Sequence, residues 1–121
     1  MKLRILGNSI RLRLTQTEVL NLQTLGSVRE ITQFAPNNFL EYELSFTDST
    51  DFMVTFHAGK ILVALPESIG KPWAKGSEIS IRKVIKMTND NDLSVLIEKD
   101  FKCKTERVGE NEEDMFPNPD C

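Results

Sequence analysis

The sequence predicts an α+β domain built on one mostly antiparallel, strongly curved or barrel-like sheet of seven to eight strands, with one main helix near residues 16–25. Two observations predict this class. Most of the first 102 residues alternate apolar and polar side chains, the period of strands with one buried face. A single segment instead spaces its apolar residues for a helix, and it is bounded by a start and a stop signal.

The chain opens with a predicted hairpin followed by the helix. The runs KLRIL (2–6) and IRLRL (10–14) alternate, and Gly7-Asn8 between them predicts a turn or a bulge. Thr15 and Glu18 are spaced as a capping box, in which each side chain bonds the backbone of the other residue. The helix is expected to end at Gly26, since glycine suits a helix C-terminus. Its apolar stripe consists of Val19, Leu22 and Leu25.

Strand signals return after the helix. The runs SVREITQF (27–34) and FLEYELSF (39–46) are separated by the turn-forming APNN. The runs DFMVTFH (51–57) and KILVALP (60–66) flank Ala58-Gly59, and a two-residue hairpin there would pair Phe56 with Ile61 and Val54 with Val63. Both of these strands carry apolar residues on both faces, which predicts a central place in the sheet.

The last part of the domain is predicted to be a connector and a final hairpin. The segment PESIGKPWAKGS (66–77) contains two prolines and two glycines, so we expect at most one helical turn there. EISIRKVIKM (78–87) and DLSVLIEKD (92–100) then predict two paired strands. No internal repeat is visible in the sequence.

Charge divides the chain into a near-neutral body and an acidic tail. A chain of 121 residues with 40% hydrophobic side chains suits a single domain. Residues 103–121 carry six acidic and two basic side chains, whereas residues 1–102 carry 12 acidic and 13 basic ones. We therefore expect a domain at 1–102 followed by an acidic C-terminal strap at 103–121. The balance argues against nucleic acid as a partner, because phosphate neutralisation requires clustered lysine and arginine.

The sequence predicts a cytoplasmic protein that has no membrane partner. Arg4, Arg11 and Arg13 interrupt the first apolar runs, so no signal-peptide core forms. No stretch approaches the roughly 20 apolar residues of a membrane span. Two cysteines without an export signal are typical of a reducing compartment.

Charged residues that share strand faces are the candidate ligand-binding residues. Arg11 and Arg13 share one face, Glu41 and Glu43 share another, and Arg82 lies in a similar run. Around a polar barrel lumen, the arginines would hold a phosphorylated ligand and the carboxylates a Mg²⁺ ion. Alternatively these charges are solvated on the outside and pair across strands, as in any half-exposed antiparallel sheet. The sequence favours the solvated alternative.

No catalytic constellation, metal site or cofactor is predicted. His57, the one histidine, lies beside the expected hairpin turn, and no nucleophile or acid is placed near it by the sequence. Gly-rich phosphate loops and the common hydrolase motifs are missing. Cys103, Cys121 and His57 would supply three zinc ligands with no close pair, one short of the usual four.

The acidic tail is predicted to dock through apolar side chains. Phe101 and Cys103 continue the alternation of the final strand. Met115 and Phe116 follow the acidic run and would offset part of the entropy lost when the tail is ordered. Phe116 would dock on its own domain or on a partner, which includes a second copy in a homo-oligomer.

Two end segments carry a resemblance to known sequences. MKLRILGNSIRLRLTQTEV at the start and LIEKDFKCKTER…FPNP at the end resemble a small family of uncharacterised bacterial proteins, a domain of unknown function. The likeness covers essentially the whole chain. It implies a bacterial origin and a cytoplasmic location, and it implies no particular chemistry.

Three classes of function follow from these observations. A small non-enzymatic binding or interaction domain needs no catalytic constellation and is favoured. A phosphate- or metal-dependent enzyme would use the Arg and Glu rows on a concave sheet face. A structural subunit would contact its partners through the acidic tail.

Overall fold

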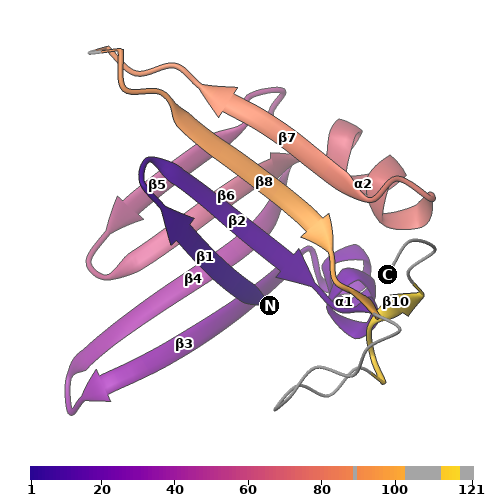
Figure 1. Cartoon of the computed structure of the whole chain (residues 1–121), viewed down its shortest axis with the longest axis horizontal. Coiled ribbons are helices and arrows are strands. Elements are labelled where there is room, and N and C mark those ends of the chain that lie inside the picture. Colours follow the sequence, from indigo (N-terminus) through magenta and orange to yellow (C-terminus); the bar gives the residue numbers. More distant parts are fainter. Residues whose placement is uncertain (89, 103–112, 118–121) are drawn as a thin grey trace.

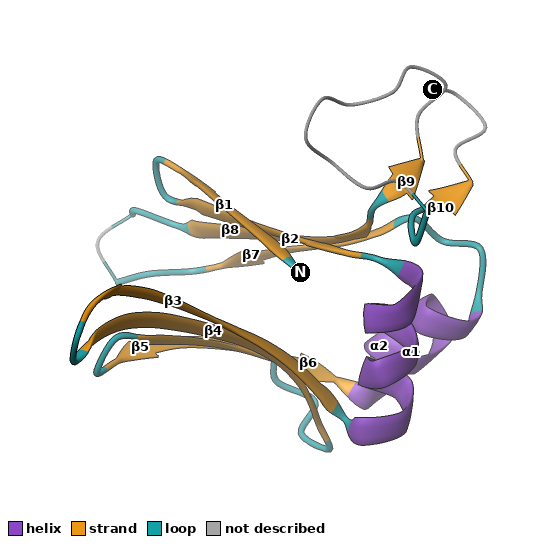
Figure 2. Ribbon diagram, turned by 90° about the horizontal axis from the view of Figure 1, so that it is seen from below, coloured by secondary structure: helices purple, strands orange, loops and turns teal. Residues whose placement is uncertain are grey.

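The computed structural model describes residues 1–88, 90–102 and 113–117 of the chain. These residues form two facing four-stranded sheets with two helices at one end (Figures 1 and 2). Sheet A has the strand order β1-β2-β8-β7 and sheet B the order β3-β4-β6-β5, and β9 and β10 form a separate pair. The elements are β1 (Lys2–Leu6), β2 (Ser9–Leu14), α1 (Gln16–Leu25), β3 (Ser27–Ala35), β4 (Asn38–Thr47), β5 (Met53–His57), β6 (Lys60–Pro66), α2 (Glu67–Lys75), β7 (Ser80–Ile85), β8 (Leu93–Lys99), β9 (Phe101–Lys102) and β10 (Phe116–Pro117).

The predicted α+β class is confirmed, but the barrel-like sheet is not found. The strands divide into two open sheets, and the central pairings β2–β8 and β4–β6 are parallel while the outer ones are antiparallel. The reason is that each sheet buries one apolar face against the other sheet, so neither has to close on itself.

The fold contains a structural repeat. The unit strand–strand–helix–strand–strand occurs first as β1-β2-α1-β3-β4 and again as β5-β6-α2-β7-β8. The two units exchange hairpins, because sheet A joins the first hairpin of unit one to the second hairpin of unit two, and sheet B joins the other two. The registers agree: Ile5 lies opposite Ile10 in sheet A, as Phe56 lies opposite Ile61 in sheet B. Sheets A and B are therefore equivalent surfaces carrying different side chains.

The first hairpin and the bounds of α1 form as the local sequence predicts, although Leu25 of the predicted apolar stripe is 75% exposed. Gly7 adopts a φ of 55° at the turn, and α1 spans Gln16–Leu25. Both hydrogen bonds of the capping box are present, and Gly26 ends the helix with a φ of 82°. The predicted register of the second hairpin is also confirmed, with Phe56 opposite Ile61 and Val54 opposite Val63. Its predicted central place is correct for β6 and wrong for β5, which is an edge strand of sheet B.

The segment after β6 was predicted to be a connector, and this is wrong because it forms α2. Trp73 is completely buried, and its indole Nε1 donates to the carbonyl of Ile79 at 3.1 Å. Gly70 lets the helix approach sheet B so closely that an added Cβ would lie 2.8 Å from Cδ2 of Leu65. Burial of the tryptophan face therefore outweighs the low helix propensity of glycine and of Pro72.

The core lies between the sheets and under the helices. Fully buried residues come from β2, β4, β6 and β8 and from both helices: Leu12, Leu14, Leu22, Leu44, Val63, Leu65, Trp73 and Ile97. Because these residues use one face of each strand, the alternate residues of the central strands point outward.

Of the predicted strap, the structure describes residues 113–117, which lie against α1 and β9. The backbone N–H of Gln16 donates to the Asp114 carbonyl at 2.9 Å, and the Asp114 carboxylate accepts from the hydroxyl of Thr17 at 2.8 Å. Met115 is buried, and the Phe116 ring centroid lies 5.6 Å from that of Phe101. This segment packs on its own chain. Residues 103–112 and 118–121, including both cysteines, lie outside the described residues.

Candidate functional site

The outward side chains of sheet A form three rows across its four strands. The strand registers place neighbours in each row directly opposite one another. The first row, nearest the β1–β2 turn, consists of Leu6, Ser9, Ser94 and Val84. The second row consists of Arg4, Arg11, Leu96 and Arg82, and the third of Lys2, Arg13, Glu98 and Ser80.

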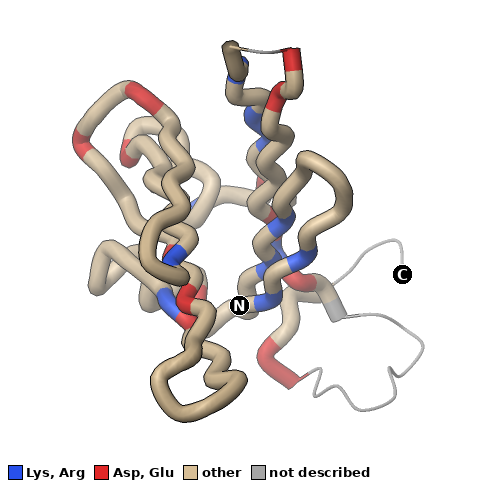
Figure 3. The backbone as a smooth tube through the Cα atoms, turned by 90° about the vertical axis from the view of Figure 1, so that its left-hand side faces the viewer, with Lys and Arg blue, Asp and Glu red and all other residues tan. Residues whose placement is uncertain are grey.

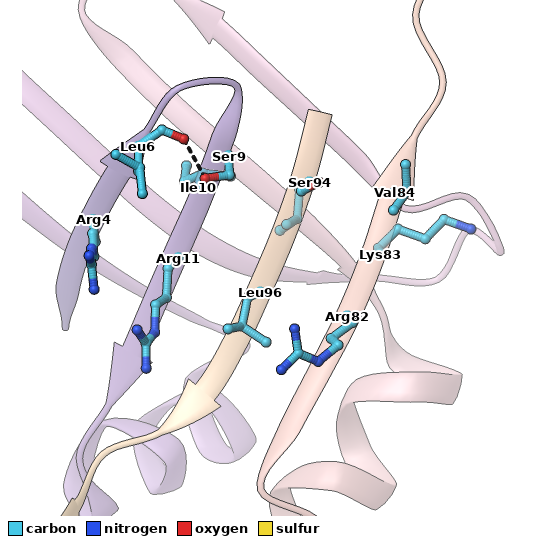
Figure 4. A pocket seen from close by; sticks show the side chains of 11 residues that line it. Arg4, Leu6, Ser9, Ile10, Arg11, Arg82, Lys83, Val84, Ser94 and Leu96 are labelled. Atoms are coloured by element: carbon cyan, nitrogen blue, oxygen red, sulfur yellow. Dashed lines mark hydrogen bonds between the residues drawn. The ribbon is translucent and has the colours of Figure 1, made fainter. Parts of the chain in front are cut away.

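A hollow of about 400 Å³ opens over the first two rows (Figure 4). Its shape follows from side-chain size: the small Ser9 and Ser94 occupy the middle of the first row, while the larger Leu6 and Val84 stand at its two ends. The half-buried Leu96 forms part of the floor in the second row. A hollow of this size is within the range of small-molecule sites, roughly 300–1,000 Å³.

An ion-pair network holds the arginines of β2. Glu98 accepts a hydrogen bond from Nε of Arg11 and forms an ion pair with Arg13, whose Nε lies 2.9 Å from the Glu98 carboxylate. The buried carboxylate of Asp100 lies 3.6 Å from Arg13 and 3.1 Å from the ammonium of Lys2. Arg13 is therefore bound to two carboxylates, and Arg11 is held at the edge of the hollow by Glu98.

Arg4 and Arg82 differ from these arginines. Both are exposed, and neither forms an ion pair with any residue in the described part of the chain. Arg4 lies directly opposite Arg11 across the β1–β2 ladder, an arrangement that is destabilising for like charges. In Figure 4, Arg82 reaches from β7 toward Leu96, so its guanidinium lies over the hollow.

The two sheets also differ in the sign of their charged residues. Figure 3 shows lysine and arginine concentrated along sheet A, whereas sheet B mixes both signs. On the outer face of sheet B the ammonium of Lys60 lies 3.1 Å from Glu41 and 3.3 Å from Glu43. Hydrogen bonds to Glu41 and then Glu43 raise the pKa of Lys60. Lys60 of sheet B is therefore paired with two carboxylates, unlike Arg4 and Arg82 of sheet A within the described residues.

The predicted site residues separate into two groups. Arg11 and Arg82 line the same hollow, and Arg13 lies one row away from it. Glu41 and Glu43 share one face of β4. This face is the outer one of sheet B, because the neighbouring Leu44 is on the opposite face and is buried in the core. The arrangement joins arginines from β2 and β7 and leaves the carboxylates on the opposite side of the sandwich.

Sequence reasoning missed most of the hollow. Arg4 could have been found, since a two-residue turn at Gly7-Asn8 places it opposite Arg11. Ser94 and Val84 could not, because their place on the same sheet face as Arg11 depends on the parallel pairing of β2 with β8, which are more than 75 residues apart.

The buried Lys99 is the other unusual ionisable group. Its Nζ donates to the carbonyl of Gly76 at 2.8 Å and lies 5.5 Å from the Trp73 ring centroid and 5.4 Å from that of Phe116. Burial lowers the pKa of Lys99, although the charge of Glu78 opposes this shift. Because these contacts join β8, α2 and β10, we interpret Lys99 as structural.

Neither metal ligands nor a membrane helix stand out in what the structure describes. Within residues 1–88, 90–102 and 113–117, no three His, Cys, Asp or Glu side chains lie close enough to share a metal ion. His57 is exposed at the end of β5, and Cys103 and Cys121, the two cysteines considered with it as zinc ligands, lie outside this part of the chain. None of the helices in the same ranges has the length and hydropathy needed to cross a bilayer.

Comparison with known proteins gives one match. The model of a family of unknown function (DUF7009) matches residues 1–120, and the chain belongs to that family. No curated protein and no solved structure matches the chain.

Proposed function

We propose that this member of the DUF7009 family is a non-enzymatic binding module that holds an anionic group in the hollow over sheet A. Arg4, Arg11 and Arg82 are the binding residues, with the hydroxyl of Ser94 as an additional hydrogen-bond donor. A guanidinium presents a planar fork of donors that matches phosphate and carboxylate oxygens.

The observation that carries this proposal is the uncompensated positive charge around the hollow. Arg4 faces Arg11 across the ladder, although only Arg11 has a carboxylate partner among the described residues. Like charges placed directly opposite cost free energy, and a bound anion would remove that cost. The equivalent positions of sheet B are Thr55 and Leu62, so this repulsion belongs to sheet A alone.

The separation of the arginines from Glu41 and Glu43 favours binding over phosphate chemistry assisted by a metal. A Mg²⁺ ion needs carboxylate oxygens close to the phosphate that it activates. Glu41 and Glu43 face outward from sheet B and are bound to Lys60. The bacterial origin and cytoplasmic location implied by the sequence resemblance stay predictions.

The test is a titration with inorganic phosphate at constant ionic strength, followed by amide chemical shifts in ¹⁵N-labelled protein. We expect saturable shifts at Ser94 and Leu96. Each of the substitutions Arg4→Gln and Arg82→Gln should weaken binding about tenfold, the effect of one charge-assisted hydrogen bond.

Sheet B supplies the matched control. Arg29 on β3 occupies the position equivalent to Arg82, because it lies opposite Glu43 as Arg82 lies opposite Leu96. Arg29→Gln removes the same charge from the other face and should leave phosphate binding unchanged. Equal losses for Arg29→Gln and Arg82→Gln would show a nonspecific charge effect and would contradict the proposal.

A further inference from the structure

We infer that the ligand of the hollow is a soluble organic phosphate monoester carrying a small apolar group, an inference that rests on the proposed function. The chemistry of the first two rows divides the hollow into a cationic part and an apolar part.

The cationic part fits a doubly charged head group. Four cationic side chains line the hollow, those of Arg4, Arg11, Arg82 and Lys83. Lys83 extends away from it in Figure 4, and Glu98 compensates Arg11, which leaves Arg4 and Arg82 without a carboxylate among the described residues. Two uncompensated charges match a phosphate monoester, which is close to a dianion at neutral pH. Arg11 and Arg82 lie on either side of Leu96, two strand spacings or about 10 Å apart at the backbone. An anion above Leu96 therefore lies between the guanidinium groups of Arg11 and Arg82.

The apolar part of the hollow fits an apolar substituent of the ligand and not a second charged group. Leu6 and Val84 stand at the ends of the first row and are 68% and 51% exposed, so they offer apolar surface that nothing in the described chain covers. Between them Ser9 already donates its hydroxyl to the carbonyl of Leu6, whereas the Ser94 hydroxyl has no partner among the described residues. A group that extends from the head group into this row meets two apolar walls and one available hydroxyl.

The size of the hollow limits the substituent. At about 400 Å³ the hollow lies near the lower end of the range of small-molecule sites. This volume suits a head group with a ring-sized apolar substituent. The matching first row of sheet B contains Lys60 paired with Glu41, so an ion pair lies where Ser9 and Ser94 leave space in sheet A.

The experiment compares ligands that share a head group, by calorimetry at constant ionic strength and a pH of about 8, where the phosphates are dianions. Phenyl phosphate is compared with inorganic phosphate, and benzoate with acetate. We expect phenyl phosphate to bind about tenfold more tightly than inorganic phosphate, as burial of part of an aromatic ring requires. Phenyl phosphate should also bind more tightly than benzoate.

Two substitutions on equivalent strands test where the apolar group lies. Val84→Ser should reduce the advantage of phenyl phosphate about threefold and leave inorganic phosphate unchanged. Ile31→Ser is the control, because Ile31 has the equivalent place on β3 and is 54% exposed, close to the exposure of Val84. Ser94→Leu fills the hollow at an exposed position and should abolish phenyl phosphate binding while the circular dichroism spectrum stays native.

Each outcome separates this inference from the proposed function. If phenyl phosphate and inorganic phosphate bind equally and both depend on Arg82, the apolar part of the inference is overturned and anion binding stands. Tighter binding of benzoate than of phenyl phosphate overturns the phosphate head group. The protein could instead bind a phosphotyrosine peptide, or vesicles containing phosphatidic acid, more tightly than phenyl phosphate. Either result would assign the head group to a protein or a lipid and would overturn the inference that the ligand is a soluble small molecule. If no ligand binds in a manner that depends on Arg82, the proposed function falls as well.

Discussion

Replacement of Met115 by alanine tests whether the segment 113–117 contributes to the stability of the domain. Met115 is 4% exposed, and the side-chain amide Nε2 of Gln16 donates to the backbone carbonyl of Met115 at 2.8 Å. Truncation of a buried methionine to alanine costs about 2–5 kcal/mol in protein cores. Because Met115 lies in a short segment at the edge of the domain, where the chain can move to fill the space, we expect a loss of about 2–3 kcal/mol.

The control for this prediction is the same substitution at an exposed site. Met53 is 53% exposed on the edge strand β5, and Met53→Ala should change the free energy of unfolding by less than about 0.5 kcal/mol. Urea unfolding followed by circular dichroism and by the fluorescence of Trp73, the single tryptophan, measures both variants. If Met115→Ala unfolds at the same urea concentration as the unchanged protein, the segment is not docked in solution and the reasoning is refuted.

Three further predictions concern the backbone and the helix ends. Ala58 has a φ of 51°, so Ala58→Gly should raise the free energy of unfolding by about 0.5–1 kcal/mol in urea titrations; a loss would show that the turn is not left-handed. Gly70→Ala should cost about 1–3 kcal/mol because the new Cβ would overlap Phe46, whereas Ser68→Ala on the exposed side of α2 should be neutral in the same assay. Burial acts to raise the pKa of Asp114, but hydrogen bonds from the first turn of α1 outweigh it and lower the pKa below its ordinary value of 3.8. The stability that Asp114 contributes is therefore present above pH 3.8 and is lost as pH falls through the lowered pKa. As pH falls from 3.8 through that pKa, the melting temperature of Asp114→Asn should approach that of the unchanged protein. A constant difference between the two proteins across this range would contradict the role of the carboxylate charge.

The elements that depend on neighbours in the sequence were predicted well. The helix α1 begins and ends where Thr15, Glu18 and Gly26 indicate, because a capping box and a left-handed glycine act within one turn. The β5–β6 hairpin has the predicted register, since a two-residue turn fixes which residues face each other. These features require no knowledge of the rest of the fold.

The second helix shows why local signals were insufficient. Residues 67–75 contain Gly70 and Pro72, both poor helix formers in the interior of a helix. The helix nevertheless forms because Trp73 is buried completely and Gly70 allows the close approach to sheet B. Both of these causes are tertiary, so a reading of the local sequence alone predicts a connector.

By itself the sequence determined the strand alternation, the first helix, the hairpins β1–β2, β5–β6 and β7–β8, and the candidate arginines. Only the tertiary structure decided how the hairpins combine into two sheets, because the parallel pairings β2–β8 and β4–β6 join distant segments whose periodicity is compatible with many partners. These pairings place Arg82 on the same face as Arg11 and put Glu41 and Glu43 on the other side of the sandwich. The alternation of a strand fixes which residues share its face, but the partner strand decides which charges meet across it.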